Sequence, residues 1–348
     1  MIPFPDAHPA NVAAADLAFG AADRLLVLAP HPDDETLVTG ELLQHALAAG
    51  AGVRVVIATD GDDNPWPQRW LERRWRIDAG ARRRWGRRRR EESLAALDVL
   101  GVPRAAVRHL GWPDGSLTDR LLDNADAGHA LAAEIAAFAP THVAMPVLDD
   151  RHPDHSALRV LAELVWASGQ AAPVQVLGFV VHACGRAAPP ARTCVDPGTP
   201  LARKLEALGQ HGSQLALSGR RMRGIALREE RFLTRLPVLQ ASSGSFLLPL
   251  RGLRLRAREL LLVAVIDARV WRGRLPLPQS NSIHALACAE APGTVVEVRL
   301  VRGRGGVEID FGGTRPALVH AKLHRRGART LIFDDDGWHA VAFHREGR

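Results

Sequence analysis

The chain has 348 residues, of which 47% are hydrophobic, and a formal net charge of +7. A chain of this length and composition can bury a sizeable core, in one large domain or in two unequal ones. The longest apolar run, at residues 260–266, is far too short to span a membrane, and the N-terminus lacks the basic start and apolar core of a signal peptide. We therefore expect a cytoplasmic protein without a transmembrane segment.

The basic residues are almost all arginine, with lysine only at Lys204 and Lys322, a bias typical of GC-rich coding. A charge of this size, spread over the whole chain, does not require a nucleic acid as partner. The three cysteines, Cys184, Cys194 and Cys288, form no Cys-x-x-Cys pair, so we expect three small buried side chains. A disulfide between the first two is the alternative.

The first 200 residues alternate short apolar segments with helical patterns. Apolar segments that predict buried strands lie at residues 25–29, 53–58, 107–110, 141–147 and 174–181. Helical patterns lie between them, at residues 36–49, 91–100, 130–138 and 156–167. This alternation predicts an α/β fold with right-handed crossovers, a Rossmann-like, doubly wound and mostly parallel sheet.

The pattern changes towards the C-terminus. Helical patterns at residues 201–217 and 225–235 are followed by short strand-like stretches separated by turn residues, at residues 259–267, 283–289, 294–302, 307–309, 318–324, 330–333 and 338–343. We therefore predict two units, an α/β domain at residues 1–244 and a β-rich domain or extension at residues 245–348. The second unit could hold part of a ligand, mediate oligomer contacts or cover the main sheet.

Two clusters of histidine and aspartate follow predicted strands. His31-Pro-Asp-Asp-Glu35 begins just after the first strand, and His152-Pro-Asp-His155 follows the fourth. In a doubly wound sheet, ligands bind outside the carboxyl ends of the strands, which places both clusters at one edge. Each cluster by itself has a simpler explanation, because Asp33, Asp34 or Asp154 could cap the helix that follows it.

Taken together, the clusters predict a metal site. They bring the imidazoles of His31, His152 and His155 and several carboxylates to one place, and such groups are costly to pack without a cation. Imidazole and carboxylate ligands without thiolate suit a catalytic zinc ion with water in the open position. Two histidines and one carboxylate also suit non-haem iron, so the residue types alone do not identify the metal.

The order and spacing of the motifs resemble the PIG-L/LmbE family of zinc-dependent N-acetylglucosaminyl deacetylases, over roughly residues 22–216. The family's motifs stand here as Pro30-His-Pro-Asp-Asp-Glu35, Thr59-Asp-Gly61, Arg89-x-x-Glu-x-x-x-Ala-x-x-x-Leu-Gly101, Leu110-Gly-Trp-Pro-Asp-Gly115 and His152-Pro-Asp-His155, with Lys204 and Ser213-Gln214 on a later helix. A single motif of this kind is weak, but five or six in order are specific. The resemblance implies hydrolysis of a linear amide.

The resemblance also implies a role for each residue of the site. His31, Asp34 and His155 would bind Zn²⁺, with Fe²⁺ or another divalent ion as the alternative. Asp33 would be the general base, and His152 would protonate or stabilise the leaving group. Bound zinc lowers the pKa of water to about 7, and a nearby carboxylate takes the proton as the water attacks. Either Asp33 or His152 could protonate the amine, and the sequence does not decide between them.

Substrate contacts follow from the same resemblance. Arg89 and Asp114 would face an N-acetylated amino-sugar conjugate. We also expect Asp62, which follows the Thr-Asp-Gly turn, to line the pocket and bind the substrate. The alternatives are that Arg89 is one solvated arginine among many and that Asp114 is a turn residue of Pro-Asp-Gly. We expect His182, at the end of the fifth strand, to be structural. His284, His320, His324 and His339 of the β-rich region show no ligand spacing, so we expect them to be structural or exposed.

Eleven arginines lie between Arg69 and Arg90, together with Trp70, Trp75 and Trp85. They indicate either a solvated, partly helical face or a positive rim of the pocket that binds a phosphate or carboxylate of an anionic conjugate. Two other functions use the same residues: a non-haem iron oxygenase with the same ligand set, and a non-enzymatic nucleic-acid binder that uses this segment. The doubly wound pattern argues against the oxygenase, and the metal clusters would have no purpose in a nucleic-acid binder.

Overall fold

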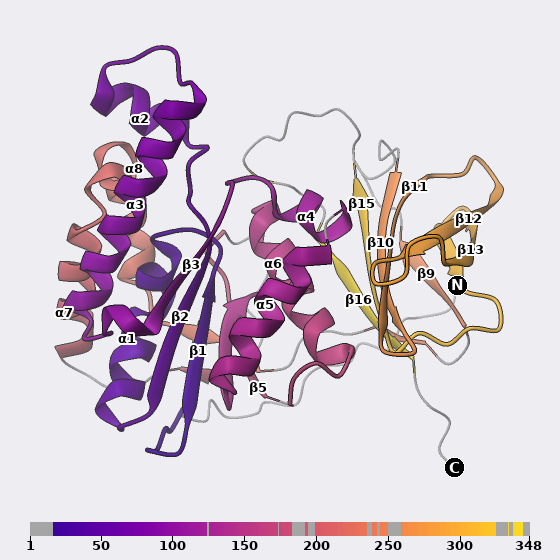
Figure 1. Ribbon diagram of the computed structural model, residues 1–348, viewed down its shortest axis with the longest axis horizontal. Helices are drawn as coiled ribbons and strands as arrows, with labels where there is room; N and C mark the ends of the chain where they lie inside the picture. The colour runs from indigo at the N-terminus through magenta and orange to yellow at the C-terminus, as the bar shows by residue number, and fades with distance from the viewer. Residues whose placement is uncertain are drawn as a thin grey trace.

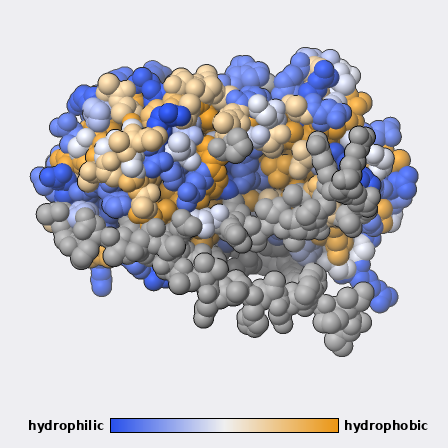
Figure 2. Space-filling view, turned by 90° about the horizontal axis from the view of Figure 1, so that it is seen from below, coloured by the Kyte–Doolittle hydropathy of each residue, from blue (hydrophilic) through white to orange (hydrophobic). Residues whose placement is uncertain are grey.

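The structure, a computed structural model, describes residues 17–123, 125–172, 174–182, 192–193, 199–234, 239–241, 244–249, 259–324, 333 and 337–343. Cys184, Cys194 and residues 330–332 of a predicted strand lie outside the described residues, while Cys288 is a buried free thiol. Among the described helices, none combines the length and the apolar character needed to cross a membrane. Seen from below, the described part of the surface mixes hydrophilic and hydrophobic residues (Figure 2).

Sheet A has five parallel strands in the order β3-β2-β1-β4-β5. The strands are β1 (Arg24–Ala29), β2 (Gly52–Thr59), β3 (Val107–Trp112), β4 (His142–Pro146) and β5 (Gln175–Phe179). The predicted α/β fold with a parallel sheet is therefore confirmed, and each strand lies within two residues of its predicted ends. The apolar runs predicted these strands well because a parallel sheet with helices on both faces is buried on both sides.

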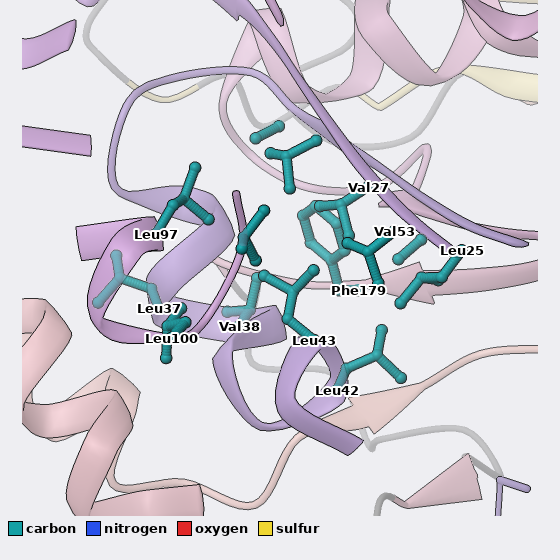
Figure 3. Close-up of a cluster of buried hydrophobic side chains, with 14 of the residues drawn as sticks. Leu25, Val27, Leu37, Val38, Leu42, Leu43, Val53, Leu97, Leu100 and Phe179 are labelled. Atoms are coloured by element: carbon teal, nitrogen blue, oxygen red, sulfur yellow. The ribbon is translucent and has the colours of Figure 1, made fainter. Parts of the chain in front are cut away.

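One face of sheet A packs against four helices, α1 (Asp34–Ala48), α3 (Ala79–Val99), α7 (Thr199–Gly209) and α8 (Gly212–Ala226). Figure 3 shows part of this core, in which Leu42 and Leu43 of α1 lie beside the strand residues Leu25 and Val53. The helix α1 is buried along most of its length, so it fixes the loop before it, which carries the first histidine–aspartate cluster.

The opposite face of sheet A is covered by α4 (Leu117–Asp123), α5 (Ala125–Phe138) and α6 (Pro153–Ala167). These helices also pack against a second sheet, which lies on their other side (Figure 1). Strand β10 (Glu259–Ile266) makes this contact: Leu261, Val263 and Val265 join the helices, whereas the residues between them join another core. This alternation has the period of a strand that lies between two apolar layers.

The second sheet, sheet C, has nine strands in the order β8-β16-β15-β10-β11-β12-β13-β14-β9. Besides β10 these are β8 (Leu239–Ala241), β9 (Ser245–Pro249), β11 (Arg269–Pro276), β12 (Asn281–Cys288), β13 (Val295–Arg302), β14 (Gly306–Asp310), β15 (Leu318–His324) and β16 (His339–Phe343). Neighbouring strands are antiparallel except for β16 and β8. The predicted C-terminal β-rich region is therefore present.

Several helices differ from the prediction. The helix predicted at residues 91–100 is the end of the longer α3, which starts at Ala79 because the Asp78 carboxylate accepts the Ala81 N–H at 2.7 Å. The helix predicted at residues 201–217 is divided into α7 and α8. The division follows from Glu92, whose carboxylate accepts the N–H of Ser213 at 2.9 Å and starts α8.

One further predicted helix is wrong, and several elements of the structure were not predicted. The helix predicted at residues 225–235 is wrong, since α8 ends at Ala226 and the short strand β7 (Arg231–Phe232) follows, paired with β6 (Arg192–Thr193). The sequence pattern gives no strand at β11, because arginines and a glycine interrupt its apolar residues. The helices α2 (Pro65–Glu72) and α4 are too short to show a helical period.

Candidate metal centre

The loops at the carboxyl edge of sheet A surround a cavity of about 670 Å³. This is where open α/β sheets bind their ligands. The cavity is lined by these predicted site residues: His31, Asp33, Asp34, Arg89, Asp114 and His152. Of the other two, His155 is fully buried beneath the cavity and Asp62 lies behind one of its loops.

The three predicted metal ligands converge on one point. Nδ1 of His31 lies 3.2 Å from Oδ2 of Asp34 and 3.3 Å from Nε2 of His155. The same Asp34 oxygen lies 3.3 Å from Nε2 of His155, and all three side chains are buried. Ligand atoms about 2.0 Å from a tetrahedral zinc ion are about 3.3 Å from one another. The type of these donors and their spacing therefore fit a divalent cation.

His152 lies on the cavity side of these ligands. Its ring centroid is 4.6 Å from that of His31 and 5.0 Å from that of His155, and ligand atoms of the three histidines lie within 4.8 Å of one another. His152 is also the N-cap of α6, since its Nδ1 accepts the N–H of Asp154 at 3.3 Å. Burial and the neighbouring charges of His31 and His155 hold the pKa of His152 well below its usual value.

Asp33 is held at the cavity by Arg89. Nη2 of Arg89 lies 3.0 Å from Oδ2 of Asp33 and donates to the carbonyl of Pro32 at 2.7 Å, while Nη1 donates to the carbonyl of Gly61. The backbone of Asp33 has a φ of 138°, which is strained for a residue with a side chain, and its carboxylate makes no capping bond to α1. Burial raises the pKa of Asp33 to about 6, although the charge of Arg89 opposes this shift. The Asp33 carboxylate therefore does not cap α1 but lies at the cavity.

Asp150, which the sequence did not single out, supports the second cluster. Its Oδ2 lies 3.3 Å from Nδ1 of His155 and accepts the N–H groups of Val181 and His182 at 2.9 and 3.1 Å. The charges of Asp150 and Asp34 raise the pKa of His155 to about 9, although burial alone would lower it. The sequence signal for this residue was its place in the loop after β4, two residues before His152.

Asp154 connects the two sides of the site. Its carboxylate accepts the N–H groups of Gly115 and Leu117 at 2.7 and 3.0 Å, so the expected alternative that it caps α6 is wrong. Its Oδ2 also lies 3.4 Å from Nε2 of His31. The carboxylate thus fixes the loop after β3, which carries Asp114, against the first cluster.

The predicted substrate-binding residues lie in different places. Asp114 lines the cavity, and its Oδ1 lies 3.1 Å from Nε2 of His31. Asp62 accepts the N–H of Asp114 at 2.9 Å and contacts Nε of Arg82 at 3.1 Å, so it supports the loop from behind. Arg89 is only 4% exposed, so the alternative of a solvated arginine is wrong.

Sheet C supplies the far wall of the cavity. The residues of this wall are Arg274 of β11, Lys322 and His324 of β15, and Phe333. His324, which the sequence led us to expect as structural or exposed, therefore lies at the cavity. His320 of the same strand is instead buried and contacts Glu163 of α6 at 3.0 Å.

His182 and Arg221 also lie at the cavity, although the sequence gave no reason to select them. The ring of His182 is 5.0 Å from that of His155, and a guanidinium nitrogen of Arg221 lies 2.6 Å from its Nδ1. Burial and the charge of His155 lower the pKa of His182 to about 3. Arg221 comes from α8, which packs beside α1, so only the helix packing brings it to the site.

The arginine-rich segment does not form the rim that one interpretation predicted. Of the arginines between positions 69 and 90, only Arg89 is among the described residues that line the cavity. Others pair with acids nearby, as Arg90 does with Asp60 and Arg84 with Glu72. The positive groups at the cavity come instead from α8, β11 and β15, which the sequence pattern could not bring together.

Fold and site together define the class of the protein: an α/β domain with buried histidine and aspartate side chains that could hold a metal ion at the carboxyl edge of its parallel sheet. Residues 26–166 match the family model of PIG-L, described as GlcNAc-PI de-N-acetylase. This segment of the chain is similar to the PIG-L family.

The curated relatives carry the name 1D-myo-inositol 2-acetamido-2-deoxy-alpha-D-glucopyranoside deacetylase. The one from Mycolicibacterium vanbaalenii is 35% identical over 167 residues, which cover 42% of this chain and 55% of the relative. The one from Rhodococcus opacus is 32% identical over 162 residues, covering 42% of this chain and 54% of that protein. The chain thus spans about half the length of the curated relatives it matches.

Among solved structures, N,N'-diacetylchitobiose deacetylase from Pyrococcus horikoshii is 19% identical and aligns with a TM-score of 0.46, over 61% of this chain and 83% of its own. The zinc-inhibited form of a teicoplanin deacetylase is 24% identical, with a TM-score of 0.44 over 56% of this chain and 86% of its own.

Proposed function

We propose that the protein is a metal-dependent deacetylase that hydrolyses the acetamide of an N-acetylglucosaminyl, or related N-acetyl-hexosaminyl, conjugate and releases acetate and the free amino sugar. The observation that carries the proposal is the convergence of His31, Asp34 and His155 beside Asp33, within a PIG-L segment. The names of the curated relatives support an N-acetylglucosamine conjugate as substrate. The strand order of sheet A supports a Rossmann-like, doubly wound description of the catalytic domain.

His31, Asp34 and His155 would hold the metal, for which we propose zinc, with Fe²⁺ as the alternative. When bound, zinc supplies a water activated for attack at neutral pH and a positive charge for the oxyanion of the amide. Asp150 orients the His155 imidazole by its contact with Nδ1, as outer carboxylates do for metal-bound histidines.

Asp33 takes the proton of the attacking water, because it is the carboxylate beside the ligands that makes no contact with them and faces the cavity. Arg89 holds this carboxylate in position. The departing amine needs a proton, which either Asp33 or His152 delivers. Asp114 contacts the sugar, and Asp62 acts through it by holding its backbone.

The cavity is larger than one acetamido sugar requires, and its far wall belongs to sheet C. We propose that residues 1–244 form the catalytic domain and that the C-terminal region contacts the part of the conjugate beyond the sugar. Arg221 at the cavity favours an anionic group on that part, whereas Arg274 is already paired with Asp119 and Asp123. The comparison of neutral with phosphorylated conjugates tests this.

The test combines metal analysis with acetate release from a panel of N-acetylglucosaminyl conjugates. We expect about one zinc per chain and acetate release that Asp33→Asn abolishes without loss of the metal. The matched control Asp98→Asn changes an exposed aspartate of α3 and should leave both quantities unchanged. Iron in the purified protein together with oxygen uptake would favour the iron enzyme. A protein that binds no metal and releases no acetate from any conjugate would contradict the proposal.

A further inference from the structure

A patch of aromatic and basic side chains lies on α2 and the turn after it, and its first tryptophan, Trp66, also lines the cavity. We call it the α2 patch, and its apolar members are Trp66, Trp70, Leu71 and Trp75, which are 56%, 68%, 38% and 76% exposed. Helix α2 projects beyond the end of sheet A, away from sheet C (Figure 1). Three tryptophans so exposed on one short segment are unusual, because each leaves a large apolar area in contact with water. A partner that covered them would remove this area from water.

The α2 patch belongs to an ordered element. The inward face of α2 buries Pro67 and Gln68, and the Gln68 amide donates to the carbonyl of Ala81 in α3 at 2.7 Å. On the outer side, the guanidinium of Arg69 lies 4.9 Å from the ring of Trp66 and 5.1 Å from that of Trp75. The tryptophans are therefore presented outwards by a framework that holds them, and they do not cover a core.

The charge around the α2 patch is mostly positive, although Arg82, Arg84 and Arg88 are paired with acids. Residues 66–88 contain nine arginines and only two acids, Glu72 and Asp78. Arg73, Arg74 and Arg76 lie within the exposed part of this segment. A shallow hollow beside Trp75, lined by Arg69, Trp75, Arg76, Ile77 and Asp78, offers two arginines to a phosphate-sized group.

We propose that the α2 patch docks on an anionic lipid surface. Tryptophan is the residue that prefers the boundary between headgroups and acyl chains, and each arginine near an anionic bilayer adds electrostatic attraction. A second copy of the chain is disfavoured because it would present the same positive charge. A single-stranded nucleic acid is also disfavoured, because it binds to tryptophan and arginine side chains that line a groove. In this protein the tryptophans and Leu71 lie on a projecting helix.

Docking of this kind would bring the cavity close to the lipid surface. Pro65, Trp66 and Pro67 at the start of α2 line the cavity, while Trp70 and Trp75 lie further along the same segment. The docking itself does not depend on the deacetylase proposal, and it can be measured without any substrate.

The experiment is co-sedimentation of the full chain with vesicles of phosphatidylcholine, with and without phosphatidylglycerol. We expect binding to the anionic vesicles that weakens with added salt. Trp70→Ala/Trp75→Ala and Arg73→Glu/Arg74→Glu should each weaken binding at least about tenfold. The matched controls are Ile283→Ala/Val295→Ala and Arg299→Glu/Arg304→Glu, exposed residues of sheet C and its turns, and they should bind like the unchanged chain.

All these side chains are exposed, so thermal unfolding should be the same in every variant. Three outcomes would overturn the proposal: no binding to anionic vesicles, equal losses in the patch and control variants, or binding to a single-stranded oligonucleotide in place of vesicles. Deacetylase activity is measured separately, so its absence would leave the docking result unaffected.

Discussion

Nη2 of Arg89 lies 3.0 Å from Oδ2 of Asp33, in an ion pair that joins α3 to the loop after β1. The same guanidinium binds two backbone carbonyls of the loops after β1 and β2. Nη1 and Nη2 of Arg89 therefore bind protein atoms, which makes Arg89 a positioning residue for the general base. The family resemblance implies instead that Arg89 contacts the substrate, and kinetic measurements can distinguish these two roles.

Arg89→Lys should lower kcat by about 10- to 100-fold and leave KM nearly unchanged, because lysine cannot reproduce the planar set of hydrogen bonds that holds Asp33. Steady-state kinetics on the best conjugate measure the two constants. Arg88→Lys, which changes the exposed neighbour paired with Glu92, is the control. A rise in KM with an unchanged kcat would instead show that Arg89 contacts the substrate.

Asp150→Ala should weaken metal binding by about 10- to 100-fold, because the variant removes the carboxylate that orients His155. Competition with a chromophoric chelator gives the affinity directly, without substrate. The neighbouring Asp149→Ala changes an exposed aspartate and should keep the original affinity. If both variants bind the metal as tightly as the unchanged chain, Asp150 has only a structural role.

Lys204→Met should destabilise the protein by about 3–5 kcal/mol. Nζ of Lys204 is fully buried and lies 2.8 Å from Glu230 and 3.2 Å from Glu41, so the substitution leaves a buried carboxylate without its counter-charge. Urea unfolding followed by circular dichroism measures the change, with the exposed Arg203→Met as control. We expect the double variant Lys204→Met/Glu230→Gln to recover part of the loss, and no recovery would argue against a charge effect.

Glu163 should make stability depend on pH in the acid range. Burial alone would raise its pKa, but the charge of Arg159 and the contact with His320 lower the pKa to about 2, below its ordinary value of 4.5. A lowered carboxyl pKa stabilises the fold fully above about pH 4.5, and this contribution is lost as the pH falls towards 2. The contact joins α6, which covers one face of sheet A, to β15 of sheet C.

The free energy of unfolding should therefore fall by about 2 kcal/mol more in the unchanged chain than in Glu163→Gln, between about pH 5 and pH 3. Urea titrations at several pH values measure the difference. Glu297→Gln, at an exposed position of β13, should follow the unchanged chain. If the free energy of unfolding changes equally with pH in the unchanged chain and in Glu163→Gln, this ion pair contributes nothing to the pH dependence of stability.

The sequence predicted sheet A and the converging ligands because both depend on short segments. The central strands β1 and β4 are almost entirely apolar, and His31 and Asp34 are three residues apart just after the first of them. The topology rule for parallel sheets then brings the second cluster, with His155, to the same edge. These inferences need no knowledge of how distant helices pack.

Segments without a clear period were predicted less well. The strand β11 carries arginines towards the cavity wall and a glycine in its middle, which hides its alternation. The end of α8 at Ala226 is equally invisible, because the apolar residues that follow it continue a helical spacing while they pair in β7. In both places tertiary contacts outweigh the local pattern.

The sequence by itself determined the parallel sheet, the place of the site at its carboxyl edge and the residues that converge there, since local apolar and motif patterns specify them. Only the tertiary structure decided that Asp150 supports His155, that Arg89 holds Asp33, and that sheet C closes the cavity with Arg274 and Lys322. The physical reason is that these contacts join segments far apart in the chain. They form only when helices and sheets pack, and the local spacing of residues in the sequence does not predict that packing.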